Sequence, residues 1–214
     1  MAEEWTTWDP AAAAVATCVV AQGAGGSTRA PLFDGIAAGL TAGGVSSMRF
    51  DFPYTRAGRR GPDRPPALLQ SWREALELTA ARADGLPLVA SGKSMGGRMA
   101  SMLAAEDGDA FAAGALVFFG YPLHPPGRVD QLRVEHLPRI TVPMLFIQGT
   151  ADALARLDLV EETVAKLGDR ARLYAVRDGD HSFRVRGRKR PDREIGEELG
   201  GVASEFIRDV VGGS

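Results

Sequence analysis

The sequence predicts a doubly wound α/β fold, in which a mainly parallel sheet of six strands is covered by helices on both faces. Three observations lead to this prediction: short apolar runs, helical patterns between them, and a length of 214 residues, which suits one well-buried domain. No shift in composition divides the chain. We therefore expect a single domain over residues 1–214, in which residues 1–12 form a peripheral N-terminal segment.

Six apolar runs, each short enough for one strand, are bounded mostly by Gly, Pro and Asp. Most of them are continuous rather than alternating, which is typical of parallel strands that are buried on both faces. The expected strands cover residues 14–21, 45–52, 86–90, 114–119, 142–147 and 171–176.

The segments between these runs carry apolar residues at helical spacing. The expected helices lie within residues 32–40, 69–80, 94–105, 154–167 and 195–210. Strand and helix alternate, which requires crossover connections and favours the doubly wound arrangement. Gly196, Gly200 and Gly201 weaken the last helix by roughly 1 kcal/mol each relative to alanine, so its packing has to outweigh that cost.

Composition and the chain start bear on the partner and the compartment. A formal net charge of -2 gives no general attraction to nucleic acid or to an anionic membrane, so we expect a small-molecule partner. Cys18 is the only cysteine, which excludes an intrachain disulfide and a cysteine-based metal cluster and fits a buried strand position. The acidic start M-A-E-E-W does not resemble a secretory signal, and the apolar run 11–21 is too short to span a bilayer. We expect a cytoplasmic protein without metal or cofactor.

The stretch S-G-K-S-M-G-G, at residues 91–97, matches parts of two different motifs. A Walker A phosphate loop needs a glycine five positions before Gly92, but that position holds Pro87, which has no N–H for a phosphate. A nucleophile elbow, G-x-S-x-G, needs a strand before it and a helix after it, and both are expected here. We therefore interpret Ser94 as a nucleophile, with Gly92 and Gly96 removing Cβ atoms that would clash around the turn.

In hydrolases built on such an elbow, the acid and then the histidine follow the serine along the chain. Asp152 comes just after the strand expected at 142–147, and His181 comes just after the strand at 171–176. Both would project from carboxyl ends of strands, where open α/β sheets have their sites. The order predicts a triad of Ser94, Asp152 and His181.

Other residues could compete for these two roles. His136 lies in a short polar segment and is interpreted as a solvated surface residue, while His124 precedes the acid and so breaks the expected order. Asp178 and Asp180 adjoin the histidine and are expected to form turns. Asp51 is expected to be a hydrogen-bonding group at a strand end, or a residue of the pocket wall.

The stretch Q-G-A-G-G at residues 22–26 directly follows the first expected strand and is rich in glycine. It can present backbone N–H groups to a developing oxyanion, from Ala24 or Gly25, with a second donor at Met95. The same stretch fails as a dinucleotide-binding fingerprint, because that pattern needs a glycine where Thr28 stands.

Only residues 120–141 separate the fourth expected strand from the fifth, which leaves little room for a lid. We expect an open, shallow site whose candidate walls are Tyr54, Tyr121, Leu123 and His124.

Two sets of basic residues flank the expected triad. Lys93, at the variable position of the elbow, is expected to be structural or at the surface. The run at 184–190 could bind an anionic leaving group such as a phosphopantetheine thioester, but a solvated loop is the favoured interpretation.

With these residues in place, the sequence resembles the α/β-hydrolase superfamily, in particular its small, lidless, dienelactone-hydrolase-like members. These include the testis-expressed and non-specific-lethal-complex hydrolase-like proteins. The resemblance rests on G-A-G-G, F-D-F-P-Y, G-K-S-M-G-G-R, G-Y-P-L-H-P-P-G, Q-G-T-x-D and G-D-H-S-F, which are spread over nearly the whole chain. It implies the strand order 4-3-5-6-7-8 in the superfamily's labelling, with the first two strands absent.

Two departures from that family pattern affect the expected chemistry. Dienelactone hydrolases proper use a cysteine where this chain has Ser94, so we expect esters or thioesters in general as substrates. The usual His-Gly before the oxyanion loop is Gln22-Gly23 here, and we expect this change to tune the loop without abolishing it.

Taken together, these residues favour a serine hydrolase of the carboxylesterase or thioesterase type, acting through an acyl-enzyme. The alternative is a catalytically silent interaction module on the same fold, because a fold does not determine its function. The presence of all three triad residues argues against that alternative.

Overall fold

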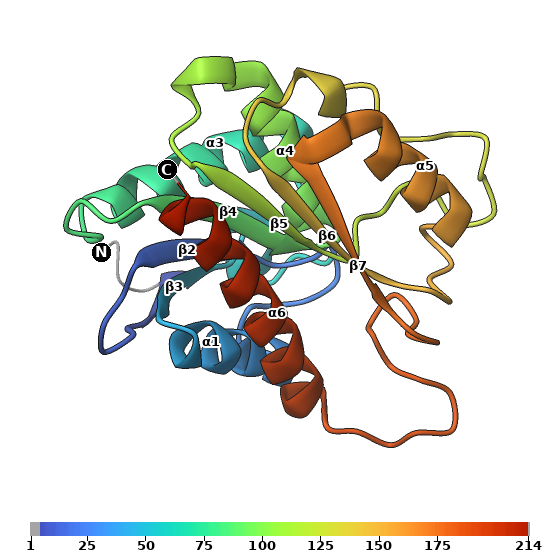
Figure 1. Cartoon of the computed structure of the whole chain (residues 1–214), viewed down its shortest axis with the longest axis horizontal. Helices are drawn as coiled ribbons and strands as arrows, with labels where there is room; N and C mark the ends of the chain where they lie inside the picture. The colour runs from blue at the N-terminus through green and yellow to red at the C-terminus, as the bar shows by residue number, and fades with distance from the viewer. Residues whose placement is uncertain (1–4, 214) are drawn as a thin grey trace.

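The computed structural model describes residues 5–213, and residues 1–4 and 214 lie outside the described part (Figure 1). One seven-stranded sheet runs through the molecule in the order β1-β3-β2-β4-β5-β6-β7. The strands are β1 (Thr6–Asp9), β2 (Ala16–Ala21), β3 (Val45–Phe50), β4 (Leu88–Lys93), β5 (Ala115–Phe119), β6 (Met144–Gly149) and β7 (Ala171–Val176). The helices are α1 (Pro31–Ala42), α2 (Pro53–Arg56), α3 (Pro65–Ala80), α4 (Met95–Asp107), α5 (Leu157–Leu167) and α6 (Asp192–Gly212).

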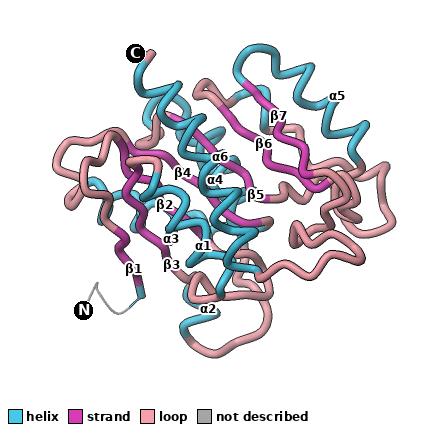
Figure 2. Tube along the Cα trace, turned by 60° about the horizontal axis from the view of Figure 1, so that its bottom comes forward, coloured by secondary structure: helices cyan, strands magenta, loops and turns pink. Residues whose placement is uncertain are grey.

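The six expected strands are all present, pair in parallel and follow the order that the resemblance implies. The predicted count of six is wrong by one, however, because β1 pairs antiparallel with β3 at the edge of the sheet (Figure 2). One strand therefore precedes the six, where the resemblance implied none. The sequence T-T-W-D gave no apolar run to reveal it, since its four side chains are only half-buried.

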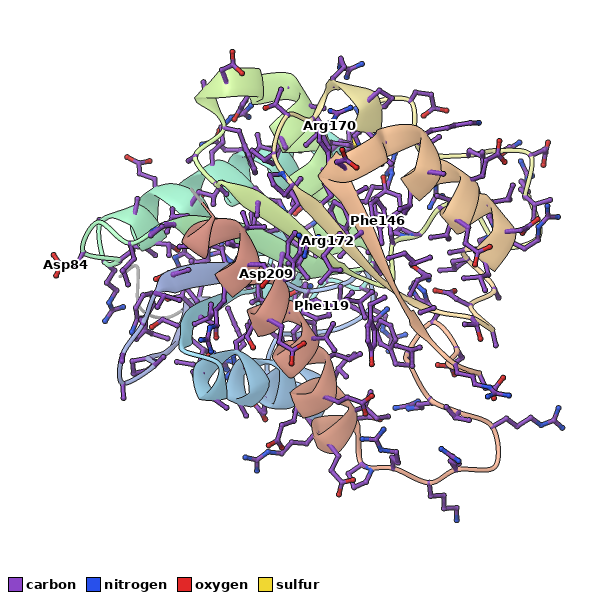
Figure 3. All side chains as sticks on the ribbon, viewed as in Figure 1. Asp84, Phe119, Phe146, Arg170, Arg172 and Asp209 are labelled. Atoms are coloured by element: carbon purple, nitrogen blue, oxygen red, sulfur yellow. The ribbon has the colours of Figure 1, made fainter. Side chains whose placement is uncertain are left out.

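The helices divide the interior into two apolar layers, one on each face of the sheet. Helices α3, α4 and α5 pack on one face, around Trp72, Leu103 and Phe146. Helices α1 and α6 cover the other face, around Ile36, Phe119 and Ile207 (Figure 1). Phe119 and Phe146 point to opposite sides of neighbouring strands, and both are labelled in the interior of Figure 3.

Burial along the strands explains why they look continuously apolar in the sequence. Strands β2 to β6 are buried at every position, whereas β7, the other edge of the sheet, is only partly covered. The parallel strands end at the same side of the sheet, so the loops that follow β2, β4, β5, β6 and β7 gather there. Between β5 and β6 the chain forms only loops and a single 3-10 turn, Leu137–Arg139, and carries no lid domain.

No helix in the described part of the chain is long and apolar enough to cross a membrane.

Helices α1 and α6 approach so closely that glycines are required at their contact. A Cβ at Gly35 would lie 2.0 Å from the carbonyl oxygen of Arg193, and a Cβ at Gly196 would lie 2.0 Å from that of Leu32. Gly39 and Gly200 repeat this contact one turn further along each helix. Two of the three glycines that weaken α6 on propensity grounds are therefore explained by packing.

Gly201, the third, offers a matched comparison, because a Cβ there would meet nothing within 4 Å. We expect Gly196→Ala to lower the free energy of unfolding by about 3 kcal/mol or more, since the new methyl group collides with backbone. Gly201→Ala is expected to raise it by up to about 1 kcal/mol through helix propensity alone. Urea denaturation of both variants measures the difference, and a similar effect at both positions would contradict the close-packing explanation.

Candidate active site

Ser94 occupies a sharp turn between the end of β4 and the start of α4. Its backbone has φ 52° and ψ −116°, a conformation that is rare for a residue with a side chain. The Ser94 N–H donates to the carbonyl oxygen of Phe119 at the end of β5, which ties the turn to the neighbouring strand. Such strain persists only where the surroundings enforce it. The geometry is that of a nucleophile elbow.

The glycines around Ser94 make this turn sterically feasible. A Cβ at Gly92 would lie 2.5 Å from the nitrogen of Gly97, and one at Gly96 would lie 2.3 Å from the carbonyl oxygen of Gln22. Both obstacles are backbone atoms, which cannot rotate away. The expected reason for these two glycines therefore agrees with the packing around the elbow.

The loops after β4, β6 and β7 bring three side chains into one hydrogen-bonded row. Nε2 of His181 lies 2.9 Å from Oγ of Ser94, and Nδ1 of His181 lies 2.7 Å from Oδ2 of Asp152. A carboxylate can only accept, so Nδ1 carries the proton and Nε2 is free to accept from the serine hydroxyl. His181 is about a quarter exposed, at 26%, while the Asp152 side chain is fully buried.

Gln148, a residue to which the sequence analysis assigned no role, helps to hold the carboxylate of Asp152. Its Nε2 donates to Oδ2 of Asp152 at 2.5 Å, and the backbone N–H of Leu154 donates to Oδ1 at 2.8 Å. With Nδ1 of His181, three donors therefore fix the position of this buried group. The signal was present in Q-G-T-x-D, where the glutamine is the last residue but one of β6 and stands four residues before the acid.

The loop at residues 22–26 is anchored from below by side chains that follow β3. Nε2 of Gln22 donates to the hydroxyl of Tyr54 at 3.1 Å and also to Thr55, and the Tyr54 hydroxyl donates to the carbonyl oxygen of Ala24 at 2.9 Å. Gln22, which stands in place of the family's histidine, is thus part of the support for the loop.

Asp51 secures the far end of the same loop. Its carboxylate accepts from the hydroxyl of Ser27 at 2.6 Å and from the backbone N–H of Thr28 at 2.7 Å. The expectation of a hydrogen-bonding group at a strand end agrees with these contacts, since β3 ends at the preceding residue.

Two backbone N–H groups were expected to bind an oxyanion, one from Ala24 or Gly25 and one from Met95. Ala24 and Gly25 are exposed on the anchored loop, and Gly23 beside them is close to the nucleophile, since a Cβ on it would lie 3.6 Å from Cβ of Ser94. Met95 is the first residue of α4, so its N–H has no acceptor within the helix. The candidate donors therefore lie on two separate elements, the 22–26 loop and helix α4, and both elements border Ser94.

A family model described as an alpha/beta hydrolase domain matches residues 14–209, nearly the whole described chain. The chain belongs to the α/β-hydrolase family. The match spans all three residues of the hydrogen-bonded row and both elements that carry the candidate oxyanion donors.

Solved structures with the same fold include several described as esterases or serine hydrolases. Dienelactone hydrolase from Anabaena variabilis is 21% identical, with a TM-score of 0.74 over 95% of this chain and 90% of its own. Est1E from Butyrivibrio proteoclasticus, solved with ferulic acid, is 17% identical, with a TM-score of 0.73 over 97% of this chain and 95% of its own. A serine hydrolase without a lid from Xanthomonas campestris is 20% identical, with a TM-score of 0.69 over 95% of this chain and 88% of its own. At these identities the likeness establishes the fold.

The expected pocket walls of this α/β-hydrolase are not exposed. Tyr54, Tyr121, Leu123 and His124 are each at most 2% accessible, so they leave almost no surface for a substrate. The polar side chains among them form internal hydrogen bonds instead. The Tyr54 hydroxyl supports the 22–26 loop, and the Tyr121 hydroxyl donates to the carbonyl oxygen of Arg133. Nε2 of His124 accepts from the backbone N–H of Arg156. A hollow of about 890 Å³ beside the 22–26 loop is instead lined by Trp5, Ser27, Arg29, Asp51, Pro53, Thr55, Arg56 and Ala57.

His136 is also placed differently from its predicted solvated position. It is half-buried, and its Nε2 lies 2.7 Å from the hydroxyl of Ser101 on α4. Burial, followed by the charges of Arg98 and Arg139, lowers the pKa of His136 to about 4, so the ring is neutral at physiological pH. It packs behind α4, apart from the row of Ser94, His181 and Asp152.

Lys93 is buried beneath His181 and is not a surface residue. A Cβ at Gly120 would lie 3.2 Å from Nζ of Lys93 and 3.6 Å from Cε1 of His181, so both groups flank this glycine. The ammonium also lies 5.6 Å from the centre of the Phe183 ring. Burial lowers the pKa of Lys93 to about 8, against the opposing effect of the Asp152 and Asp180 charges.

The lowered pKa of Lys93 predicts how the effect of Lys93→Met on the free energy of unfolding depends on pH. Between pH 8 and the ordinary lysine pKa of 10.5, the unfolded chain binds the proton and the folded chain does not, so stability rises with pH. Below pH 8 the folded protein bears the full cost of the buried charge. The variant is therefore expected to be about 1 to 3 kcal/mol more stable than the wild type at pH 7, with a much smaller gain at pH 10.5.

Denaturant midpoints of both proteins at the two pH values measure this difference. The same gain at pH 7 and pH 10.5 would rule out charge burial as its cause.

Proposed function

We propose that the chain is a serine hydrolase that cleaves small esters or thioesters through an acyl-enzyme. The observation that carries the proposal is the hydrogen-bonded row from Ser94 through His181 to Asp152, with contacts of 2.9 and 2.7 Å. The row starts at a strained elbow and ends at a buried carboxylate. This is the arrangement that nucleophilic acyl transfer requires.

In the proposed reaction, Oγ of Ser94 attacks the acyl carbonyl while Nε2 of His181 takes the hydroxyl proton. Asp152 keeps the proton on Nδ1 and stabilises the imidazolium that forms. The carbonyl oxygen becomes negative and is stabilised by the N–H groups of Met95 and of Ala24 or Gly25. His181 then protonates the leaving group, which departs as an alcohol or a thiol.

Water completes the cycle by attacking the acyl-enzyme. His181 takes a proton from the water, and the tetrahedral intermediate collapses to release a carboxylic acid and restore the Ser94 hydroxyl. The absence of a lid between β5 and β6 favours small or extended substrates over long acyl chains that need an enclosed pocket.

Hydrolysis of p-nitrophenyl acetate and butyrate by the wild type and by Ser94→Ala tests this proposal. We expect the substitution to lower kcat/KM by about a thousandfold or more, because it removes the nucleophile. Ser182→Ala is the matched control, since it removes a hydroxyl from the loop that carries His181 and is expected to retain activity.

Labelling with a fluorophosphonate probe separates this proposal from a catalytically silent interaction module. A serine hydrolase is expected to be labelled at Ser94, and the Ser94→Ala variant is not. No turnover of any acyl length together with no labelling of the wild type would refute the proposal.

The support beneath the 22–26 loop gives a second prediction. Tyr54→Phe removes the hydroxyl that bridges Gln22 and the carbonyl oxygen of Ala24. The donor on this loop would then be less well positioned, so we expect kcat to fall roughly tenfold with KM little changed. Removal of an oxyanion donor itself lowers kcat by about a hundred- to a thousandfold. The loss expected for Tyr54→Phe is smaller, because the donor is displaced and not removed.

Tyr121→Phe is the control for this measurement, because Tyr121 is equally buried and its hydroxyl bonds to Arg133, away from the loop. Steady-state kinetics of both variants are compared with their melting temperatures. Equal losses of kcat in the two variants would point to a general loss of stability instead of a role in positioning the loop.

A further inference from the structure

The long connection between β7 and α6 borders a pocket that is lined by none of the three residues of the hydrogen-bonded row. This connection, residues 177–191, extends widely from the sheet before the chain returns as α6 (Figure 1). The pocket between them has a volume of about 510 Å³, which lies within the range of small-molecule sites. Its lining combines two kinds of side chain, cationic at the rim and apolar beneath.

The rim carries more positive charge than the neighbouring carboxylates compensate. Its cations are Arg177, Arg184, Arg188, Lys189 and Arg190. Three of them form ion pairs: Arg177 with Asp178 at 3.8 Å, Arg184 with Asp192 at 2.7 Å and Arg190 with Glu198 at 2.7 Å. Among the described residues, Arg188 and Lys189 form no ion pair.

Two uncompensated cations beside one pocket are unexpected in this chain. Its formal net charge is -2, so the excess of positive charge here is local. The Arg184 and Arg190 pairs also attach the loop to α6 at both ends of the run, which holds Arg188 and Lys189 over the pocket. A solvated loop, the interpretation favoured by sequence, does not require a cavity beneath its charges.

Beneath the rim, the pocket is apolar and contains one exposed aromatic ring. Phe183, Ile195 and Leu199 form buried parts of its floor. Tyr174 on β7 also lines it and is 37% exposed. A flat ring of a ligand can stack on such a tyrosine while its anionic group reaches the cations.

We propose that this pocket binds an organic phosphate, with the phosphate at Arg188 and Lys189 and a flat or apolar body on Tyr174 and the floor. Guanidinium and ammonium groups bind phosphate oxygens through charge-assisted hydrogen bonds. A volume of about 510 Å³ suits a small molecule better than an extended nucleic acid chain.

The pocket shares its wall with the turn that carries His181. Val185 lines the pocket and forms a bridge with Gly179, and Oδ1 of Asp180 accepts from the N–H groups of Ser182 and Arg184. Phe183 has a positive φ of 63° and separates the pocket from the ammonium of Lys93. A bound phosphate therefore lies behind the histidine turn, where it can belong either to the substrate's leaving group or to a separate effector.

Calorimetric titration with ADP, inorganic pyrophosphate and adenosine tests the proposal on the wild type and two variants. Arg188→Glu reverses a cation of the pocket. Arg186→Glu reverses an equally exposed cation of the same run that does not line it. The pair therefore compares a cation that lines the pocket with a cation of the same run that does not. Physiological ionic strength weakens long-range attraction to the run as a whole.

We expect ADP to bind the wild type more tightly than pyrophosphate or adenosine does, because it alone combines phosphates with a flat ring. Arg188→Glu is expected to weaken ADP binding about tenfold or more, and Arg186→Glu to weaken it less than about twofold. Arg188→Lys, which keeps the charge, is expected to retain binding. Equal losses in the two glutamate variants, no binding of ADP, or adenosine binding as tightly as ADP would each overturn the proposal.

Ester hydrolysis in the presence of ADP then identifies the source of the phosphate. Competitive inhibition assigns it to the substrate, and a change of kcat, or none, assigns it to a separate molecule. The titration itself does not depend on turnover, so it tests the pocket even if the proposed hydrolase activity fails.

Discussion

The strained turn at Ser94 constrains the structure around it. A residue with a side chain is held at φ 52° because Gly92 and Gly96 let β4 and α4 come into contact with one another and with Gln22, the residue after β2. That contact brings the loop after β2 beside the nucleophile. The loop and the first turn of α4 are thereby neighbours, although they are far apart in the sequence.

The other side of the site depends on a buried carboxylate. Asp152 has no exposed side-chain surface, and its two oxygens are held by Gln148, the N–H of Leu154 and His181. A charge in this position is stable only with several donors. The end of β6 therefore determines where the imidazole stands, and Lys93 below it adds a second buried charge of opposite sign.

Sequence reasoning recovered the parts of this arrangement that depend on local pattern. Continuous apolar runs marked β2 to β6, and the position of Ser94, Asp152 and His181 after strands predicted that they would meet. It missed features that depend on tertiary contact. β1 is too short and polar to recognise alone, and His136 looks like a surface residue until its neighbours are known. For Lys93 the sequence left a structural and a surface position open, and the structure has the structural one. Tyr54 and Tyr121 follow strands at the correct edge, but nothing local shows that they point inward.

The glycine contact between α1 and α6 has a consequence for how the protein is made. Helix α1 ends at Ala42, whereas its partner begins at Asp192, so the face that α6 covers has no occupant until α6 has left the ribosome. Synthesis proceeds at about 5–20 residues per second, so this face stays uncovered for many seconds. Nascent chains therefore carry an apolar surface that chaperones can recognise, and premature termination before α6 leaves that surface uncovered permanently.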